Sequence, residues 1–264
     1  MLPIALKAAK AWRAKGRYGR MIARAPEPGR TLMDCIQREE QSPDHIKIIN
    51  SGLNSITEFG KETSSQFSLD ELTSAADAAR SRRQKIMVHA NGRLPVENAL
   101  TARCDSIEHG FFMGRDNMQK MAELQITWIP TEFSMKAFST LMPPESVEVQ
   151  VAARNLEHQI NQIETARTLG VPIAVGTDAG GYGLRHGASF SDELELFMAG
   201  GFTIEETIRC ATFEGARLLG LHHELGRLAK GMPASFVAIG GPPSALPGAL
   251  KHVKTVYIRG KRVI

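Results

Sequence analysis

The sequence predicts an α/β fold built on a parallel sheet, and three observations lead to that prediction. From Ile46 onward, strand-like and helix-like segments alternate, which is typical of βα units. Three motifs place a potential metal-binding side chain directly after a short apolar run: VHANG at His89, SIEHG at His109 and VGTDAG at Asp178. The length of 264 residues fits one α/β barrel or two small domains. Because parallel α/β barrels keep their chemistry where strands end and loops begin, we expect these side chains to form a site there.

The predicted strands are short runs rich in β-branched and apolar residues. They are IKIIN (46–50), KIMVHA (85–90), DSIEHG (105–110), ITWIPT (126–131) and PIAVGTD (172–178). The segment ALKAAKAWRAK (5–15) reads as a solvated helix that leads into a further strand, YGRMIAR (18–24). The sequence therefore predicts about six barrel strands.

The predicted helices fall between the strands and have recognisable start and stop signals. Ser68 with Glu71 and Thr203 with Glu206 form two capping boxes, each at the start of a helix. Gly170 ends a long helix. The expected helices are 69–83, 95–103, 117–124, 145–169 and 204–219.

The sequence changes character after Leu221. SFVAIGG and KTVYIRGKRVI read as short strands joined by the Pro- and Gly-rich segment GGPPSALPG. Two or three strands bury little surface alone, so we expect them to pack on other structure. We therefore predict a partial barrel at 1–221 and the C-terminal strands of a small β-domain at 222–264.

Composition and charge narrow the class of protein. Hydrophobic content of 42% and charged content of 23% are ordinary for a globular protein. The basic N-terminal stretch is compatible with a transit peptide or a nucleic-acid patch, but a solvated helix explains it sufficiently. Three scattered cysteines without a CxxC motif are typical of reduced thiols, so we expect a cytoplasmic protein without a nucleic-acid or membrane partner.

With these motifs in view, the chain resembles the amidohydrolase superfamily, specifically its imidazolonepropionase/prolidase-like metal-dependent hydrolases. The matching segments are HIKIINSG, IMVHANG, DSIEHG, WIPT, VGTDAGG, ATFEGARLLGL and LGRLAKGMPASFVAI, spanning residues 45–264. The resemblance implies a (β/α)8 TIM-barrel-type fold with part of a small β-sandwich domain. It also implies one or two divalent metal ions, commonly zinc.

The resemblance assigns roles to four residues. Lys47 matches a lysine that is carboxylated and bridges two metals, His89 and His109 match single histidine ligands, and Asp178 matches a metal-binding, catalytic aspartate. In this scheme a metal-activated water attacks a carbonyl, and Asp178 carries its proton to the leaving amine. The alternatives are a surface lysine, two buried core histidines and an aspartate that caps a helix.

Three further residues follow the ligand motifs and are predicted to contact substrate: Asn91, Tyr182 and His186. For His186, an exposed loop position is the alternative. The predicted substrate is a small molecule with an amide, cyclic amide or dipeptide-like C–N bond.

One feature departs from the family pattern, because no His-x-His pair precedes Lys47. We therefore expect a barrel lacking its first strands and one metal-ligand pair. A fragment, a subunit completed by a partner, and a degenerate relative all explain this. The open barrel edges favour an oligomer or a requirement for the missing segment.

The function alternatives follow from the same motifs. An inactive fragment or partner subunit is the rival to a working hydrolase, since a site that lacks ligands binds metal weakly. A deaminase is less favoured, because those enzymes need an acidic group soon after the fifth-strand histidine. Here Ala90, Asn91, Gly92 and Arg93 follow His89.

Overall fold

The computed structural model describes residues 6, 8, 10–40, 43–181 and 183–264. The chain divides into two compact units, Ile4–Pro130 with Thr168–Pro172 and Thr131–Arg167 with Ile173–Ile264. The domain boundary expected between residues 221 and 222 stays a prediction.

A six-stranded parallel sheet forms the centre of the first unit, in the order β2-β1-β3-β4-β5-β6. Its strands are β1 (Ala11–Trp12), β2 (Ala23–Arg24), β3 (His45–Ile49), β4 (Lys85–Ala90), β5 (Ser106–His109) and β6 (Thr127–Ile129). The parallel α/β prediction is confirmed. Because all six strands run in the same direction, their carboxyl ends share one edge.

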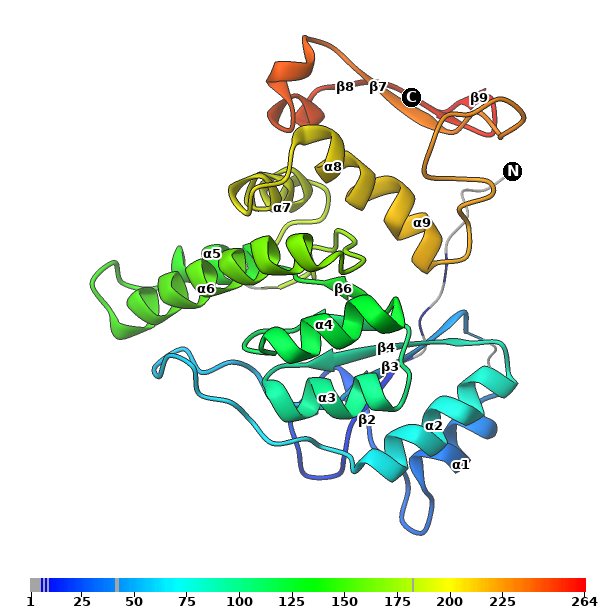
Figure 1. The fold of residues 1–264 in the computed structure, drawn as a ribbon, viewed down its shortest axis with the longest axis vertical. Helices are drawn as coiled ribbons and strands as arrows, with labels where there is room; N and C mark the ends of the chain where they lie inside the picture. Colours follow the sequence, from blue (N-terminus) through cyan, green and yellow to red (C-terminus); the bar gives the residue numbers. More distant parts are fainter. Residues whose placement is uncertain (1–5, 7, 9, 41–42, 182) are drawn as a thin grey trace. The chain divides into compact units, whose positions relative to one another are not determined.

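Helices α1 (Leu32–Gln37), α2 (Leu69–Ser81), α3 (Arg93–Thr101) and α4 (Arg115–Leu124) connect these strands. Helices that follow one another in the chain pack together: α1 on α2, α2 on α3 and α3 on α4. Figure 1 shows α2, α3 and α4 in this arrangement. The predicted capping box at the start of α2 is present: the Ser68 hydroxyl accepts the Glu71 N–H, and the Glu71 carboxylate accepts the Ser68 N–H.

The two faces of the sheet differ in chemistry, because successive side chains of a strand alternate between faces. One face presents a row of fully buried apolar side chains, namely Ile46, Ile48, Ile86, Val88, Ile107 and Trp128. The other face presents, in register, Lys47, His89, Ser106 and Glu108. The apolar face supplies the core, and the other face brings polar and charged side chains together.

The N-terminal prediction was wrong. In place of a helix over 5–15, the described residues hold β1 and a parallel bridge between Ala8 and His45. Trp12 explains the difference, since it is only 5% exposed and pairs with Arg24 on one side and Ile48 on the other. Burial of this indole in the sheet overrides the helix propensity of the alanine-rich segment. Of the predicted strand 18–24, only Ala23–Arg24 is paired.

The predicted strand at 172–178 does not form a regular strand; Ile173 alone is in a β-bridge. The Pro172 carbonyl accepts the Trp128 N–H at 2.8 Å, so the segment begins beside β6. The Val175 N–H then donates to the Cys210 carbonyl at 3.4 Å, and this helical partner takes the place of a neighbouring strand.

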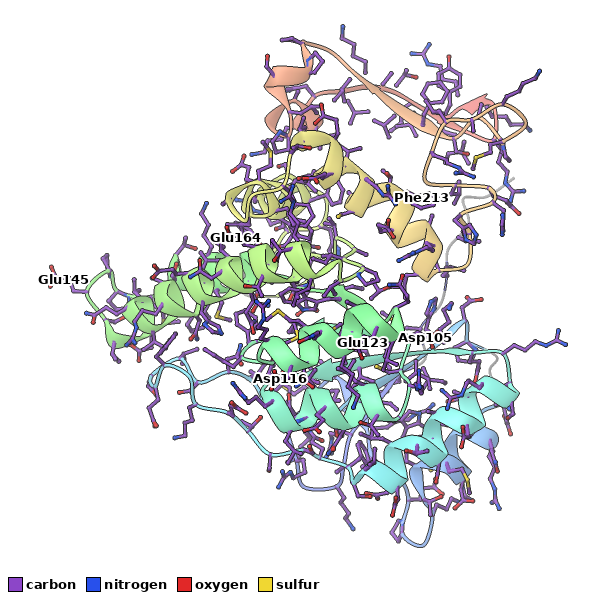
Figure 2. The ribbon with its side chains drawn as sticks, in the orientation of Figure 1. Asp105, Asp116, Glu123, Glu145, Glu164 and Phe213 are labelled. Atoms are coloured by element: carbon purple, nitrogen blue, oxygen red, sulfur yellow. The ribbon has the colours of Figure 1, made fainter. Side chains whose placement is uncertain are left out.

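The second unit is mainly helical. Its helices are α5 (Phe133–Ser139), α6 (Val147–Leu169, whose last two residues belong to the first unit), α7 (Ala188–Ala199), α8 (Ile204–Arg209), the π-helical turn η1 (Cys210–Glu214) and α9 (Gly215–Leu218). The predicted helices at 145–169 and 204–219 are confirmed, with the π-helical turn inside the second. Phe213 of that turn, labelled in Figure 2, lies beneath the guanidinium groups of Arg209 and Arg227.

The C-terminal residues form a three-stranded antiparallel sheet, as the sequence predicted. It contains β7 (Phe236–Ile239), β8 (Val253–Ile258) and β9 (Lys261–Arg262), with the short 3-10 helices η2 (Pro243–Ala245) and η3 (Gly248–Lys251) between β7 and β8. The three cysteines are free thiols and buried. Within the described part of the chain, every helix is too short or too polar to cross a bilayer.

Candidate metal site at the carboxyl ends of β3, β4 and β5

Three of the four predicted metal ligands lie on adjacent strands of the first unit. Lys47 is on β3, His89 is the fifth residue of β4, and His109 is the last residue of β5. The register pairs Lys47 with Met87 and Ile49 with His89, which places Lys47 and His89 on the same face. The structure therefore brings these three predicted residues together.

His109 reaches this face through an unusual backbone conformation. The register pairs it with Ala90, so alternation alone would direct its ring to the face opposite His89. Its φ of 68° is left-handed, and its ring centroid lies 4.7 Å from that of His89. Strained φ values of this kind persist where surrounding contacts hold them, and they cluster at functional sites.

The surroundings of His109 hold this conformation. The Trp128 indole N–H donates to the His109 carbonyl at 2.9 Å. Gly110 follows with a φ of 64°, and a Cβ there would lie 2.6 Å from Nε1 of Trp128. A glycine is therefore required at this close approach.

His89 is held as a neutral imidazole of defined tautomer. Its Nε2 lies 3.1 Å from the Gly52 carbonyl, and a carbonyl can only accept, so Nε2 carries the proton. Burial lowers the pKa of His89 to about 4, the Lys47 ammonium acts in the same direction, and the bond to Gly52 opposes them. Its Nδ1 lone pair is consequently free to bind a cation.

Burial also lowers the pKa of His109 well below its ordinary value, with His89 and Lys47 as smaller causes. Both rings are therefore neutral near neutral pH, which is the form that binds zinc-like ions.

Lys47 has a buried carboxylate beside it that the sequence reasoning did not identify. Its Nζ lies 3.9 Å from Oε2 of Glu108, and the Ser106 hydroxyl donates to Oε1 of Glu108 at 2.6 Å. The signal was present in SIEHG, because alternation along β5 places Glu108 on the same face as His89. This geometry is an ammonium–carboxylate pair, and carboxylation of Lys47 would replace it with two neighbouring negative charges.

Tyr18 is a second residue that the sequence did not indicate. Its ring centroid lies 5.7 Å from that of His89, and its ring is partly exposed. The Gln66 side chain holds the Tyr18 loop, because its amide donates to the carbonyls of Tyr18 and Ser51 and accepts the Ala14 N–H. Only the tertiary structure places this loop beside β4.

The other predicted site residues have varied positions. Asn91 is buried, and its amide bonds to backbone groups. Asp178 and His186 belong to the second unit, where both are exposed and Asp178 has a φ of 50°. Tyr182 lies outside the described residues. The convergence of Asp178 with the two histidines stays a prediction, as do the substrate contacts of Tyr182 and His186.

The donor set fits part of a metal site. The two neutral imidazoles, one buried and one half-buried, have adjacent rings and are of the type that binds a divalent cation through nitrogen. Across the described residues, no three His, Cys, Asp or Glu side chains gather closely enough to hold a metal ion. Lys47 lies close enough for its charge to act on both rings, and only as a carbamate would it offer oxygen ligands.

Comparison with known proteins gives the class of this chain. A family model described as the amidohydrolase family matches residues 6–263. The chain therefore belongs to the amidohydrolase family.

Two curated relatives are similar to part of it. The chain is 27% identical over 195 residues to an uncharacterized protein of Mycobacterium tuberculosis, covering 73% of this chain and 51% of that protein. It is 26% identical over 201 residues to ochratoxinase of Aspergillus niger, covering 74% of this chain and 40% of that protein. The chain thus spans about half the length of the curated relatives it matches.

Solved structures agree on the fold. A Xaa-Pro dipeptidase with bound methionine has a TM-score of 0.75 and 24% identity, covering 97% of this chain and 66% of that one. A prolidase in complex with N-methylphosphonate-L-proline has a TM-score of 0.76 and 25% identity, covering 92% and 60%. A putative prolidase from Bifidobacterium longum has a TM-score of 0.79 and 22% identity, covering 96% and 64%. The predicted TIM-barrel-type fold of the amidohydrolases is confirmed.

Proposed function

We propose that this protein is a metal-dependent hydrolase that cleaves the C–N bond of an amide or dipeptide-like substrate. One observation carries the proposal: the buried His89 and the half-buried His109, both neutral, lie with adjacent rings at the carboxyl ends of parallel strands. Membership of the amidohydrolase family and likeness to prolidases and ochratoxinase support this class of bond.

The histidines would hold the metal, which we propose is zinc. Nδ1 of His89 is free because Nε2 donates to Gly52. When bound, such a cation polarises a carbonyl and makes water acidic enough to serve as a nucleophile near neutral pH. His89 and His109 remain neutral ligands throughout, because their burial disfavours protonation.

The resemblance to the family assigns the remaining roles in this proposal to Lys47 and Asp178. Lys47, as a carbamate, would add two oxygen ligands, and the Glu108 side chain would then have to rotate away from it. Asp178 would accept the proton of the attacking water and deliver it to the leaving amine.

A second candidate is a metal-binding subunit without catalytic activity. The observation that favours it is that, in the described part of the chain, three acidic, thiol or imidazole ligands do not gather at one point. A two-ligand zinc site is weak, so such a chain would need groups from elsewhere.

The test is metal content and amide hydrolysis of the full chain after zinc loading. We expect bound zinc and turnover of Xaa-Pro dipeptides or N-acyl amino acids. His89→Ala and His109→Ala should each lose zinc and lower kcat/KM by at least about 10²-fold, since the charge stabilisation supplied by the metal disappears. Asp178→Asn should lose turnover.

His252→Ala is the matched control, because His252 is an exposed histidine in the second unit, and it should behave as wild type. Zinc without turnover of any amide would favour the non-catalytic subunit. Failure of the wild-type chain to bind zinc or any other divalent metal would contradict both candidates.

A further inference from the structure

We propose that Asn91 is a positioning residue, which orients His89 and the loop of His109 for metal binding and does not contact substrate. This inference rests on the proposed function, since such positioning matters when the two histidines bind a metal. The sequence predicted substrate contact for Asn91, but its side chain is 4% exposed and bonded at both ends to backbone.

Asn91 joins the loops that follow three adjacent strands. It lies in the loop after β4, two residues beyond His89. Its N–H donates to the Ser51 hydroxyl at 2.9 Å and its Nδ2 to the Gly52 carbonyl at 3.4 Å, both in the loop after β3. Its Oδ1 accepts the Phe111 N–H at 3.1 Å, in the loop after β5.

The contact with Gly52 bears on the tautomer of His89. The same carbonyl accepts the Ser51 hydroxyl at 2.9 Å and His89 Nε2 at 3.1 Å, so Asn91 Nδ2 is one of three donors around it. The Gly52 N–H donates to the Thr63 hydroxyl at 2.7 Å, which fixes the preceding peptide, between Ser51 and Gly52. An oriented Gly52 carbonyl keeps the proton on Nε2 of His89 and leaves Nδ1 as the ligand atom.

The contact with Phe111 bears on His109. Phe111 is two residues beyond His109, and the intervening backbone is left-handed, with φ values of 68° at His109 and 64° at Gly110. The Gly92 N–H also donates to the Phe111 carbonyl at 2.7 Å. Removal of the Asn91 acceptor would leave the Phe111 N–H buried without its partner and loosen the segment that turns His109 toward His89.

Two substitutions separate the two contacts. Asn91→Asp keeps an oxygen for the Phe111 N–H but sets a carboxylate oxygen against the Gly52 carbonyl, whereas Asn91→Ala removes both contacts. Asn117→Ala is the matched control. Asn117 is also buried, and its Nδ2 donates to the carbonyls of Arg93, the first residue of α3, and Met113, in the loop after β5, without contacting Gly52 or Phe111.

The experiment has a metal-free measurement and a zinc measurement. In metal-free wild type, ¹⁵N NMR of the histidine rings should show His89 protonated on Nε2. Asn91→Asp and Asn91→Ala should show a mixture of both tautomers, and Asn117→Ala should match wild type. Zinc competition with a chromophoric chelator should show dissociation constants about 10- to 100-fold weaker for both Asn91 variants and unchanged for Asn117→Ala.

Three results would overturn the inference: protonation of wild-type His89 on Nδ1, unchanged tautomer and zinc affinity in both Asn91 variants, or an equal loss in Asn117→Ala. The first needs no variant, so the inference remains testable if an Asn91 variant does not fold. If wild type takes up no zinc, the proposed function fails, while the tautomer measurement still decides the role of Asn91.

Discussion

The left-handed φ of 68° at His109 is the backbone feature on which the histidine pair depends. A strand that continued its alternation would direct the two rings to opposite faces of the sheet. The histidines themselves were recognisable from the motifs VHANG and SIEHG. The angle was not, because it is fixed by the Trp128 indole and by the close approach at Gly110, both of which are tertiary contacts.

Burial of His89 predicts an acid-sensitive contribution to stability. Its pKa is about 4 in the folded protein against 6.5 when unperturbed. Above pH 6.5 the ring is neutral in both states and contributes nothing. As the pH falls from 6.5 toward 4, His89 binds a proton in the unfolded chain but not in the folded protein. The free energy of unfolding therefore decreases by about 3 kcal/mol.

The measurement is urea unfolding of the metal-free protein across this pH range. His89→Gln keeps a donor for the Gly52 carbonyl but has no group that titrates in this range. On acidification its free energy of unfolding should therefore fall by about 3 kcal/mol less than that of wild type. His252→Gln, at an exposed site, serves as the control and should follow wild type. Parallel losses in wild type and His89→Gln would contradict the assignment.

Among the elements, β1 differs most from its sequence prediction. The alanine- and lysine-rich segment at 5–15 has the local propensity of a helix, yet Ala11–Trp12 pairs between β2 and β3. The guanidinium of Arg24 lies 4.0 Å from the centroid of the Trp12 ring, so the indole is covered as well as paired. Propensity is a weak preference that burial of one large side chain can exceed.

Trp12→Ala tests this placement. Truncation of a buried tryptophan at this position should lower the free energy of unfolding by about 3–5 kcal/mol. Truncation of a tryptophan on a solvated helix would lower it by about 0.5 kcal/mol or less. Urea unfolding can be followed by the fluorescence of Trp128, the second of the two tryptophans. Trp12→Phe keeps most of the apolar area and should lose less stability than Trp12→Ala. A near-zero change in the free energy of unfolding for Trp12→Ala would instead support the helix predicted from the sequence.

At the scale of the whole molecule, the second unit contains a buried acid, Glu132. Its effect on the stability of the folded protein depends on pH in the opposite sense to that of the histidines. Glu132 is fully buried, and both its carboxylate oxygens lack a hydrogen-bond partner among the described residues. Burial, and then the charge of Glu193, raise the pKa of Glu132 well above its ordinary 4.5. Glu193 accepts the N–H groups of Glu132 and Phe133 and so caps α5.

Stability should therefore fall on the alkaline side as well. Above pH 4.5 the unfolded chain releases the Glu132 proton and the folded chain keeps it, which costs about 1.4 kcal/mol per pH unit until the folded pKa is reached. Burial also raises the pKa of Glu193 to about 8, so Glu193 adds a decline of the same sign, and Glu132→Gln should reduce the decline in urea unfolding without abolishing it. Glu145→Gln, at the exposed position labelled in Figure 2, should leave the decline intact; equal profiles for all three proteins would contradict the prediction.

The sequence by itself determined the parallel α/β architecture, most strand and helix positions, and three side chains of the site, because hydrophobic periodicity and the ends of strands are local patterns. The Lys47 ion pair with Glu108 and the neighbour Tyr18 required the tertiary structure, since Tyr18 lies in a loop whose position depends on Gln66. The tertiary structure also decided the strand β1 and the role proposed for Asn91. Long-range hydrogen bonds and burial set these features, and neither is encoded in a short stretch of sequence.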